Sequence, residues 1–467
     1  MKLFKNTLSK ITSQDADESK AVAEENDALY NGQEGTTAVW TTGQEFQFYV
    51  PWLWDDSPEP PRDKLHPNRQ VIRIPRPTDI PGFTEEFLDD WIEESVTSAV
   101  KELVHDEEHY ITCTERQLKR GHYDQTKAWR HFNIVQSKCD LPEVSVPGCD
   151  GVLPVEMTIV VKEVSIRREQ TSACLEWLTL PSPGKCIERI KNQVRIYLTL
   201  ECSMHIHIRP QTMLEFDLQS FKKMASLLWL AEERLDKLYH PARSKPDNTF
   251  YRSLRRHTNL ALDKDPPTTG RPDDYATVLG PVKLARGEEE KLVTIWRACD
   301  CYELRELLRV HASIGKHDYP AYNFFNLFKV SDKKTIEFRK TESTIEAQVV
   351  DAWIEVFLVL TDFCMTCSTK DFQRVMESLG KPDNVYSTWH LLRDIGCKSL
   401  TVEVLKQKFM QQWLPEGPVS RPASRAATST STLSSNSAAT RLRLRDAIRD
   451  GTEKVGGKIA GGYSYGR

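Results

Sequence analysis

An acid and a base stand two residues apart in the segment Thr335–Arg339, whose sequence is Thr-Ile-Glu-Phe-Arg. Successive side chains of a strand point to opposite faces, so Glu337 and Arg339 would share a polar face that is backed by an apolar one. A carboxylate that holds a cation, beside a guanidinium that pairs with phosphate oxygens, suits the recognition of a triphosphate. The alternative is a salt bridge on an exposed strand, worth less than about 1 kcal/mol.

Two further segments show the same alternation. In Glu45–Phe48, Glu45 would share one face with Gln47, and Mg²⁺ takes carboxylate or carbonyl oxygens as ligands at about 2.0–2.1 Å. In His205–Ile208, His205 and His207 would lie about 6.6–7 Å apart on one face, so that one can bind a metal while the other meets a substrate or a second ion. Taken alone, each segment is more simply explained by a solvated polar face or by hydrogen-bonded histidines.

A third acid, Glu156, lies inside the apolar run Pro154–Ile159. A carboxylate flanked by valine, methionine and isoleucine either faces solvent or is retained for function. If residues 45–48, 205–208 and 335–339 form strands of one sheet, its polar face carries Glu, Gln, two His, Glu and Arg. That set of side chains suits a site for a metal ion and phosphate.

The other candidate motifs are weaker. Cys364 and Cys367 have a spacing typical of zinc or redox sites, but they end a helical stretch, which favours buried structural thiols. The segment Tyr239–Arg243, with Tyr251 and Arg252 nearby, either recognises a nucleotide base or an anionic substrate or forms a plain loop. The sequence contains no Gly-x-Ser-x-Gly, Walker A or dinucleotide-binding motif.

Apolar spacing predicts the elements that position these residues. Helices are predicted from Leu218 to Tyr239, with Asp217 as N-cap, over Glu346–Phe363, and from Thr84 as N-cap to Leu103. Alternation predicts six strands: Glu45–Val50, Val155–Val161, Val194–Glu201, His205–Arg209, Phe324–Lys329 and Thr335–Arg339. The polar, proline-rich stretch at about 243–274 is interpreted as a long insertion loop.

Length and composition set the class of protein. The chain has 467 residues, enough for a sizeable core, and its net charge of −4 predicts neither a nucleic-acid nor a membrane partner. No apolar run approaches the roughly 18 residues that span a bilayer. Eleven scattered cysteines and no signal-peptide pattern predict reduced thiols and a cytoplasmic location. Residues 1–37 and 416–467 are predicted to be disordered tails, which leaves 38–415 as the folded domain.

In their order along the chain, these segments resemble the amidoligase family, which is found widely in fungi and bacteria and belongs to the carboxylate–amine ligases related to glutamine synthetase and glutamate–cysteine ligase. The resemblance covers about residues 38–370. Its motifs are Gly43–Gln47, Val155–Thr158, Cys202–His207, His240–Arg243 with Tyr251, Tyr322–Leu327, Thr335–Arg339 and a helix that carries Trp353. The strand with the sequence Thr-Ile-Glu-Phe-Arg and the His-x-His strand are the most specific of these.

The resemblance implies an α+β fold, in which a curved antiparallel sheet of glutamine synthetase-like type has helices packed on one side. It implies an activity that joins a small-molecule or peptide carboxylate to an amine, with ATP and Mg²⁺, or Mn²⁺ in its place, as cofactors. The metal ligands that it implies are Glu45, Glu156, His205 and Glu337. The catalytic residues would be Glu337, Arg339 and His207, and the nucleotide would be bound by Arg339, Arg243 and Asn326.

The sequence also departs from the family pattern. Gln47 replaces the second acid of the first strand, Ser203 replaces a glycine, and Lys340–Thr344 replaces a Gln-His-x-Gly-Thr run. These departures keep two alternatives open. One is a non-catalytic protein with the ligase fold that binds partners or acts as a scaffold, and the other is a metal-dependent hydrolase that uses the histidines and the acids.

Overall fold

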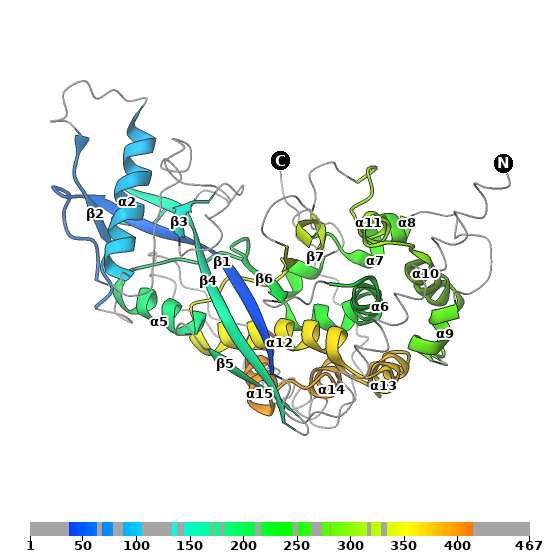
Figure 1. The fold of residues 1–467 in the computed structure, drawn as a ribbon. Coiled ribbons are helices and arrows are strands. Elements are labelled where there is room, and N and C mark those ends of the chain that lie inside the picture. Colours follow the sequence, from blue (N-terminus) through cyan, green and yellow to red (C-terminus); the bar gives the residue numbers. More distant parts are fainter. Residues whose placement is uncertain are drawn as a thin grey trace, which may run out of the picture.

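A computed structural model describes residues 37–62, 68–77, 87–104, 133–137, 144–169, 172–177, 182–210, 216–245, 251–262, 273–280, 282–314, 319–327 and 334–413. Within these residues the fold is α+β, as predicted, and is built on one open sheet (Figure 1). Apart from Thr37 at its edge, the two predicted tails lie outside the described residues.

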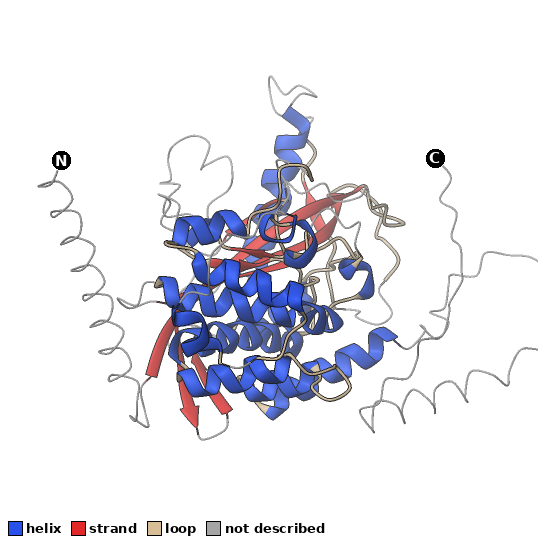
Figure 2. Ribbon diagram, turned by 90° about the vertical axis from the view of Figure 1, so that its right-hand side faces the viewer, coloured by secondary structure: helices blue, strands red, loops and turns tan. Residues whose placement is uncertain are grey.

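The sheet has eight described strands, and its central path runs in the order β3-β4-β1-β6-β8-β7. The strands are β1 (Thr37–Trp54), β2 (Ile72–Ile74), β3 (Asn133–Gln136), β4 (Gly151–Glu169), β5 (Ser172–Trp177), β6 (Met204–Pro210), β7 (Tyr322–Asn323) and β8 (Ile336–Phe338). All pairs are antiparallel except β1 with β2, and β5 extends the sheet beside β4. Figure 1 shows β4 and β5 running to the lower end of the sheet, and Figure 2 shows strand ends that extend beyond the helices.

Strand alternation gives the sheet an apolar and a polar face. After the irregularity at Trp40/Thr42, the even-numbered side chains Phe46, Phe48 and Val50 of β1 are buried in the hydrophobic core. The odd-numbered ones, which include Glu45 and Gln47, point to the other face because successive side chains of a strand alternate. The same rule separates the isoleucines of β6 from its two histidines, as the sequence predicts.

The described helices pack mainly against the apolar face, and Figure 2 shows several of them in layers beneath the strands. They are α2 (Leu88–Val104), α5 (Pro183–Gln193), α6 (Leu218–Leu235), η3 (Asp236–Leu238), η4 (Pro241–Ser244), α7 (Leu254–His257), α8 (Asn259–Leu262), α9 (Asp273–Leu279), α10 (Arg286–Arg297), α11 (Cys301–Leu307), η5 (Phe325–Leu327), α12 (Ala347–Thr366), α13 (Thr369–Leu379), α14 (Thr388–Asp394) and α15 (Ser399–Trp413). None of the helices in the described ranges is long and apolar enough to cross a membrane.

Helix α12 is the support of the site strands. It packs against α5, α6, α15 and β6, and it is buried along most of its length. Phe338 of β8 stacks on Phe357 of α12, with ring centroids 4.1 Å apart, and Trp353 of the same helix stacks on Tyr239 at 5.1 Å. This stacking fixes the apolar side of β8, so the neighbouring Glu337 is held on the opposite face.

The long helices match their predictions, and two predicted strands are wrong. Asp217 caps α6 by accepting a hydrogen bond from the Ser220 N–H, whereas Thr84 lies outside the described residues. The stretch Val194–Glu201 makes only isolated bridges, because a turn closes when the Cys202 N–H bonds the Thr199 carbonyl.

The second wrong strand, Phe324–Lys329, is replaced by β7 followed by the short helix η5. The Asn323 Oδ1 accepts the Phe325 N–H at 2.9 Å, which turns the chain away from an extended path. Residues 328–330 lie outside the described part of the chain.

The stretch predicted as one long loop, about 243–274, contains the helices α7 and α8. The buried Glu232 of α6 accepts hydrogen bonds from the Ser253 hydroxyl and from the N–H groups of Leu254 and Arg255. A carboxylate at a helix N-terminus satisfies N–H groups that have no partner inside the helix. This contact from a distant helix is invisible in the local sequence.

Candidate metal site

Strand register brings four site residues together at the centre of the sheet. Glu45 of β1 pairs directly with His205 of β6, and His207 of β6 pairs directly with Glu337 of β8. Directly opposed side chains on one face lie about 4.5–5.5 Å apart at their Cβ atoms. Asn323 of β7 pairs with Glu337 in turn, so the polar row continues to the edge of the central path.

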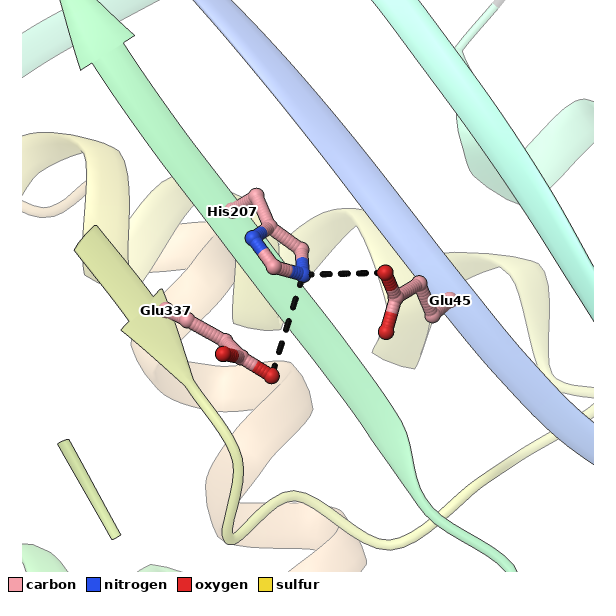
Figure 3. A group of neighbouring side chains, drawn as sticks. All are labelled: Glu45, His207 and Glu337. Carbon is pink, nitrogen blue, oxygen red and sulfur yellow. Dashed lines mark ion pairs between the residues drawn. The ribbon is translucent and has the colours of Figure 1, made fainter. Parts of the chain in front are cut away.

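The two carboxylates converge on His207 (Figure 3). The His207 Nε2 lies 3.2 Å from the Glu45 Oε1 and 3.8 Å from the Glu337 Oε1. The His205 Nδ1 lies 3.3 Å from the Glu45 Oε2 and 3.7 Å from the Glu337 Oε1. One ligand atom each from Glu45, His207 and Glu337 lies within 4.8 Å of the other two, and all three residues are buried. This group is called the metal group below.

A cation fits the metal group because one buried nitrogen has no aligned partner. The His207 Nδ1 is 3.1 Å from the Thr335 hydroxyl, which orients the ring. Its Nε2 is buried and makes no hydrogen bond of good geometry with any described residue, although two carboxylates are near. Carboxylates and an imidazole are donors that Mg²⁺, Mn²⁺ and related ions accept, and a second partner on the imidazole is typical of a metal-binding histidine.

The Glu337 carboxylate is held from both sides. Its Oε2 accepts hydrogen bonds from Asn323 Nδ2 at 2.8 Å and Asn326 Nδ2 at 3.3 Å, and its Oε1 accepts one from Arg339 Nη1. Burial on its own would raise the pKa of Glu337. The Arg339 guanidinium and the nearby histidines outweigh that effect and lower the pKa to about 2, so the carboxylate is charged.

His205 is suited to donate a lone pair. Burial lowers its pKa, and the Arg339 charge lowers it further, against the opposing effects of Glu45 and Glu337. The ring is therefore neutral at physiological pH. A neutral imidazole is the form that binds metals.

Arg339 stands at the edge of the metal group. Its guanidinium carbon lies 4.7 Å from the centre of the Tyr319 ring, and its side chain is 17% exposed. Its Nε is buried and has no hydrogen-bond partner among the described residues. Burial lowers the pKa of Arg339, but the Glu337 charge outweighs burial and raises it, so the group stays cationic. A cation with one N–H unused can bind an anionic ligand.

Glu156, a predicted metal ligand, lies beside the metal group and not within the set of three. It pairs with Gln47, two residues after Glu45, and its Oε2 accepts a hydrogen bond from Gln47 Nε2 at 3.2 Å. The Gln47 carbonyl oxygen accepts the Ser203 N–H at 3.1 Å. Gln47 therefore links β4, β1 and the start of β6.

Arg243, a predicted nucleotide contact, is also apart from the metal group. Its guanidinium donates to the backbone carbonyls of Leu200, Cys202, Lys340 and Thr341 and lies over the Tyr251 ring. These bonds join the chain ahead of β6 to the chain after β8. A nucleotide contact by Arg243 stays a prediction, whereas Asn326 reaches the site through Glu337.

Sequence reasoning missed the roles of Thr335, Asn323 and Tyr319. Thr335 shares the polar face of its segment with Glu337, so alternation places it correctly without showing its contact with His207. Asn323 and Asn326 are spaced by three residues, which puts both amides on one side of a tight turn. Tyr319 carries no local signal, because its contact with Arg339 depends on the tertiary fold.

Comparison with known proteins adds one finding. Residues 162–361 match the model of a family described as "Putative amidoligase enzyme". The matched segment contains both histidines of the site, Glu337 and Arg339, whereas Glu45 and Glu156 precede it. The comparisons find no match among curated proteins and none among solved structures.

Proposed function

We propose that the protein is an ATP- and Mg²⁺-dependent carboxylate–amine ligase, because residues 162–361 match the amidoligase family model. The observation that carries the proposal is the convergence of Glu45, His207 and Glu337, from three neighbouring strands, beside the cationic Arg339. We infer that this ligase acts through an acyl phosphate and that its sheet is of the glutamine synthetase-like type.

The metal group would hold the cation that accompanies ATP. The carboxylates of Glu45 and Glu337 and the His207 Nε2 would supply the donors, and Thr335 keeps the imidazole oriented. When bound, a divalent cation offsets the negative charge of the phosphate oxygens. His205, neutral and within 3.7 Å of both carboxylates, is a further donor at the same position.

Arg339 would hold a phosphate oxygen. In the structure its Nη1 donates to the Glu337 Oε1, the same oxygen that faces both histidines. If a cation is held by that oxygen, Arg339 would exchange this bond for one to the nucleotide. Asn323 and Asn326 bind the other oxygen of Glu337 and keep the carboxylate in place during this exchange.

The reaction needs little covalent chemistry from the protein. A carboxylate oxygen of the substrate attacks the terminal phosphorus of ATP, the bond to ADP breaks, and an acyl phosphate forms. The amine then attacks the acyl carbon, and phosphate and a proton leave. Fixed charges and positioning supply most of the acceleration in phosphoryl transfer.

The departures from the family pattern fall outside the metal group. Gln47 accepts a hydrogen bond from the Ser203 N–H and donates one to Glu156. After Arg339 the chain turns to structural contacts, because Lys340 pairs with Asp236 and Glu342 with Lys408. These positions support the strands, so their substitution is compatible with an active site.

The test is ADP release by purified protein with ATP, Mg²⁺ and mixtures of amines and carboxylates. Glu337→Gln, which keeps the size of the side chain, should reduce substrate-stimulated ADP release by a factor of about 10² or more. Glu346→Gln is the control, because Glu346 is 62% exposed and pairs only with Lys191 among the ion pairs of the described chain. Unchanged ADP release in Glu337→Gln would contradict the proposal. Turnover without nucleotide would favour the hydrolase alternative.

A further inference from the structure

Two buried arginines, Arg69 and Arg195, carry N–H groups that no described residue accepts. Each residue is 9% exposed, and the Arg69 Nη2 and the Arg195 Nε have no hydrogen-bond partner within the described ranges. Neither forms an ion pair with a carboxylate of the described chain. A buried charge without a counter-charge is costly, so such a pair indicates a site that an anion completes.

Arg195 lies on the same face of the sheet as the metal group. Val194 and Ile196 are in the hydrophobic core, so Arg195 between them points to the opposite side. Tyr197, two residues on, pairs with Tyr49 of β1 through two backbone hydrogen bonds of 2.9 Å. Tyr49 is an odd-numbered residue of β1, and the odd-numbered residues of that part of β1 form the polar face.

Arg69 lies on the segment next to Arg195. Gln70 bridges Val194 in parallel, and the Arg195 N–H donates to the Gln70 carbonyl at 2.8 Å. Arg69, directly before Gln70, is buried, whereas Gln70 itself is exposed. The two arginines therefore lie on adjacent segments, within reach of one ligand.

Distance along β1 relates this pair to the metal group. The pairing of Tyr49 with Tyr197 sets Arg195 level with Pro51, and Pro51 is six residues from Glu45. At about 3.3 Å per residue, this corresponds to about 20 Å. An extended peptide covers that length in about six residues.

We propose that Arg69 and Arg195 bind an oxyanion, and that its source is a carboxylate at the far end of an extended, peptide-like substrate whose reacting group lies at the metal group. The second part rests on the proposed ligase function. A guanidinium is a planar fork that matches the two oxygens of a carboxylate or a phosphate. The Arg195 Nη2 donates to the Pro61 carbonyl at 3.2 Å, which orients the fork before a ligand binds.

Arg73 on β2 provides the matched control. It shares a strand face with Arg69, but its guanidinium is already occupied. It donates to the carbonyls of Trp54, Asp55 and Ser57 and pairs with Glu59 at 2.9 Å. An arginine whose donors are used in this way has little left for an anion.

The experiment measures thermal unfolding of metal-free protein with added oxyanions at constant ionic strength. The metal is removed on a chelating resin, because a soluble chelator is itself an anion. The probes are inorganic phosphate, succinate and an acidic hexapeptide with a free or an amidated C-terminus. We expect succinate and the free-acid peptide to raise the melting temperature of the wild type and of Arg73→Gln. The variant with Arg69→Gln and Arg195→Gln should bind them about 10- to 100-fold more weakly.

Because the double variant loses two buried, unpaired charges, its anion-free melting temperature should equal or exceed that of the wild type. A large fall would overturn the proposal, since it would mean that the arginines are structural. Equal oxyanion shifts in the double variant and the wild type would overturn it as well. A shift with phosphate alone would overturn the assignment of a carboxylate. No metal or nucleotide is present, so these results do not depend on the ligase reaction.

Discussion

Two groups of buried charges lie along one stretch of chain, residues 335–342, and they are built differently. The metal group, to which this stretch contributes Glu337, has two carboxylates facing His207, whose buried Nε2 has no aligned hydrogen-bond partner among the described residues. A second group, called the paired group, has one opposite charge for each member: Lys340 with Asp236, and Glu342 with Lys408.

The difference separates a structural role from a binding role. In the paired group, attraction within each pair offsets the cost of taking the charges out of water. In the metal group, two carboxylates act on the one guanidinium of Arg339, and the neighbouring His205 is neutral. A bound cation would relieve the repulsion between two carboxylates held so close together. The same reasoning applies to Arg69 and Arg195, with the opposite sign.

The largest expected effect is on folding, when the paired group is broken. Lys408→Met leaves the buried Glu342 without its partner and should cost about 3–5 kcal/mol of unfolding free energy. Glu45→Gln in metal-free protein should instead leave stability unchanged or increase it, because it relieves repulsion between two carboxylates. Urea unfolding checks both variants. Comparable losses in the two would show that the metal group is also structural.

The next largest effect is expected for substitution of Arg339, which should change the affinities for the metal ion and for the nucleotide in opposite directions. Arg339→Gln removes the donor that competes for the Glu337 Oε1, so Mn²⁺ should bind about tenfold more tightly. The nucleotide should bind about 10- to 100-fold more weakly, because a charged hydrogen-bond donor is lost. Calorimetry measures both affinities, with Arg76→Gln, an exposed residue paired with Asp56, as control. Weaker Mn²⁺ binding in Arg339→Gln would mean that Arg339 supports the metal group.

Substitutions of Thr335 and Thr341 should distinguish the metal group from the paired group by a smaller effect on metal affinity. Thr335→Val removes the partner of the His207 Nδ1 and should weaken Mn²⁺ binding about tenfold, with folding retained. Thr341→Val is the matched control, because the Thr341 hydroxyl is buried and has no partner among the described residues. It should leave metal binding unchanged and should not lower stability. Equal effects of the two substitutions on Mn²⁺ affinity would contradict the assignment of Thr335.

The smallest effect is the pH dependence of the paired group. Burial on its own would raise the pKa of Glu342, but Lys408 and then Arg243 outweigh burial and lower it. The pKa of Glu342 is lower in the folded protein than the ordinary value of about 4.3. The stability that its charge contributes is therefore complete above about pH 4.3 and is lost as pH falls through the folded-state pKa. The slope is at most about 1.4 kcal/mol per pH unit for one proton. Between pH 6 and pH 3, unfolding free energy should fall less steeply in Glu342→Gln than in the wild type. A slope remains in the variant because Glu337, whose pKa is also lowered, still contributes to it.

The parts of the site that follow from strand alternation could be predicted from the sequence. Alternation alone places Glu45, His205 and Glu337 on one polar face, and the structure brings them together. The choice between the two histidines could not be predicted, since it depends on register: His207, opposite Glu337, has the free Nε2. The position of Glu156, opposite Gln47, follows from register too.

The fold was predictable where the signal is local. The helix that begins after Asp217 follows from its N-cap and its apolar stripe. The helix at Leu254 depends on Glu232, a residue more than 20 positions earlier, so the local sequence indicates only a polar loop. The chain bends after Asn323 because the Asn323 side chain accepts a hydrogen bond from the Phe325 N–H. The sequence pattern there is that of a strand and does not predict the bend.

The central claim is that Glu45, His207 and Glu337 hold one divalent cation. The most direct test is a calorimetric titration of metal-free protein with Mn²⁺ in the absence of nucleotide, for the wild type, for His207→Ala and for Lys408→Gln. One site should be found in the wild type, and His207→Ala should weaken it by about 10²-fold. Folded Lys408→Gln protein should keep the wild-type affinity, because the paired group takes no part in binding the ion. No binding by the wild type, or equal affinity in His207→Ala, would contradict the claim.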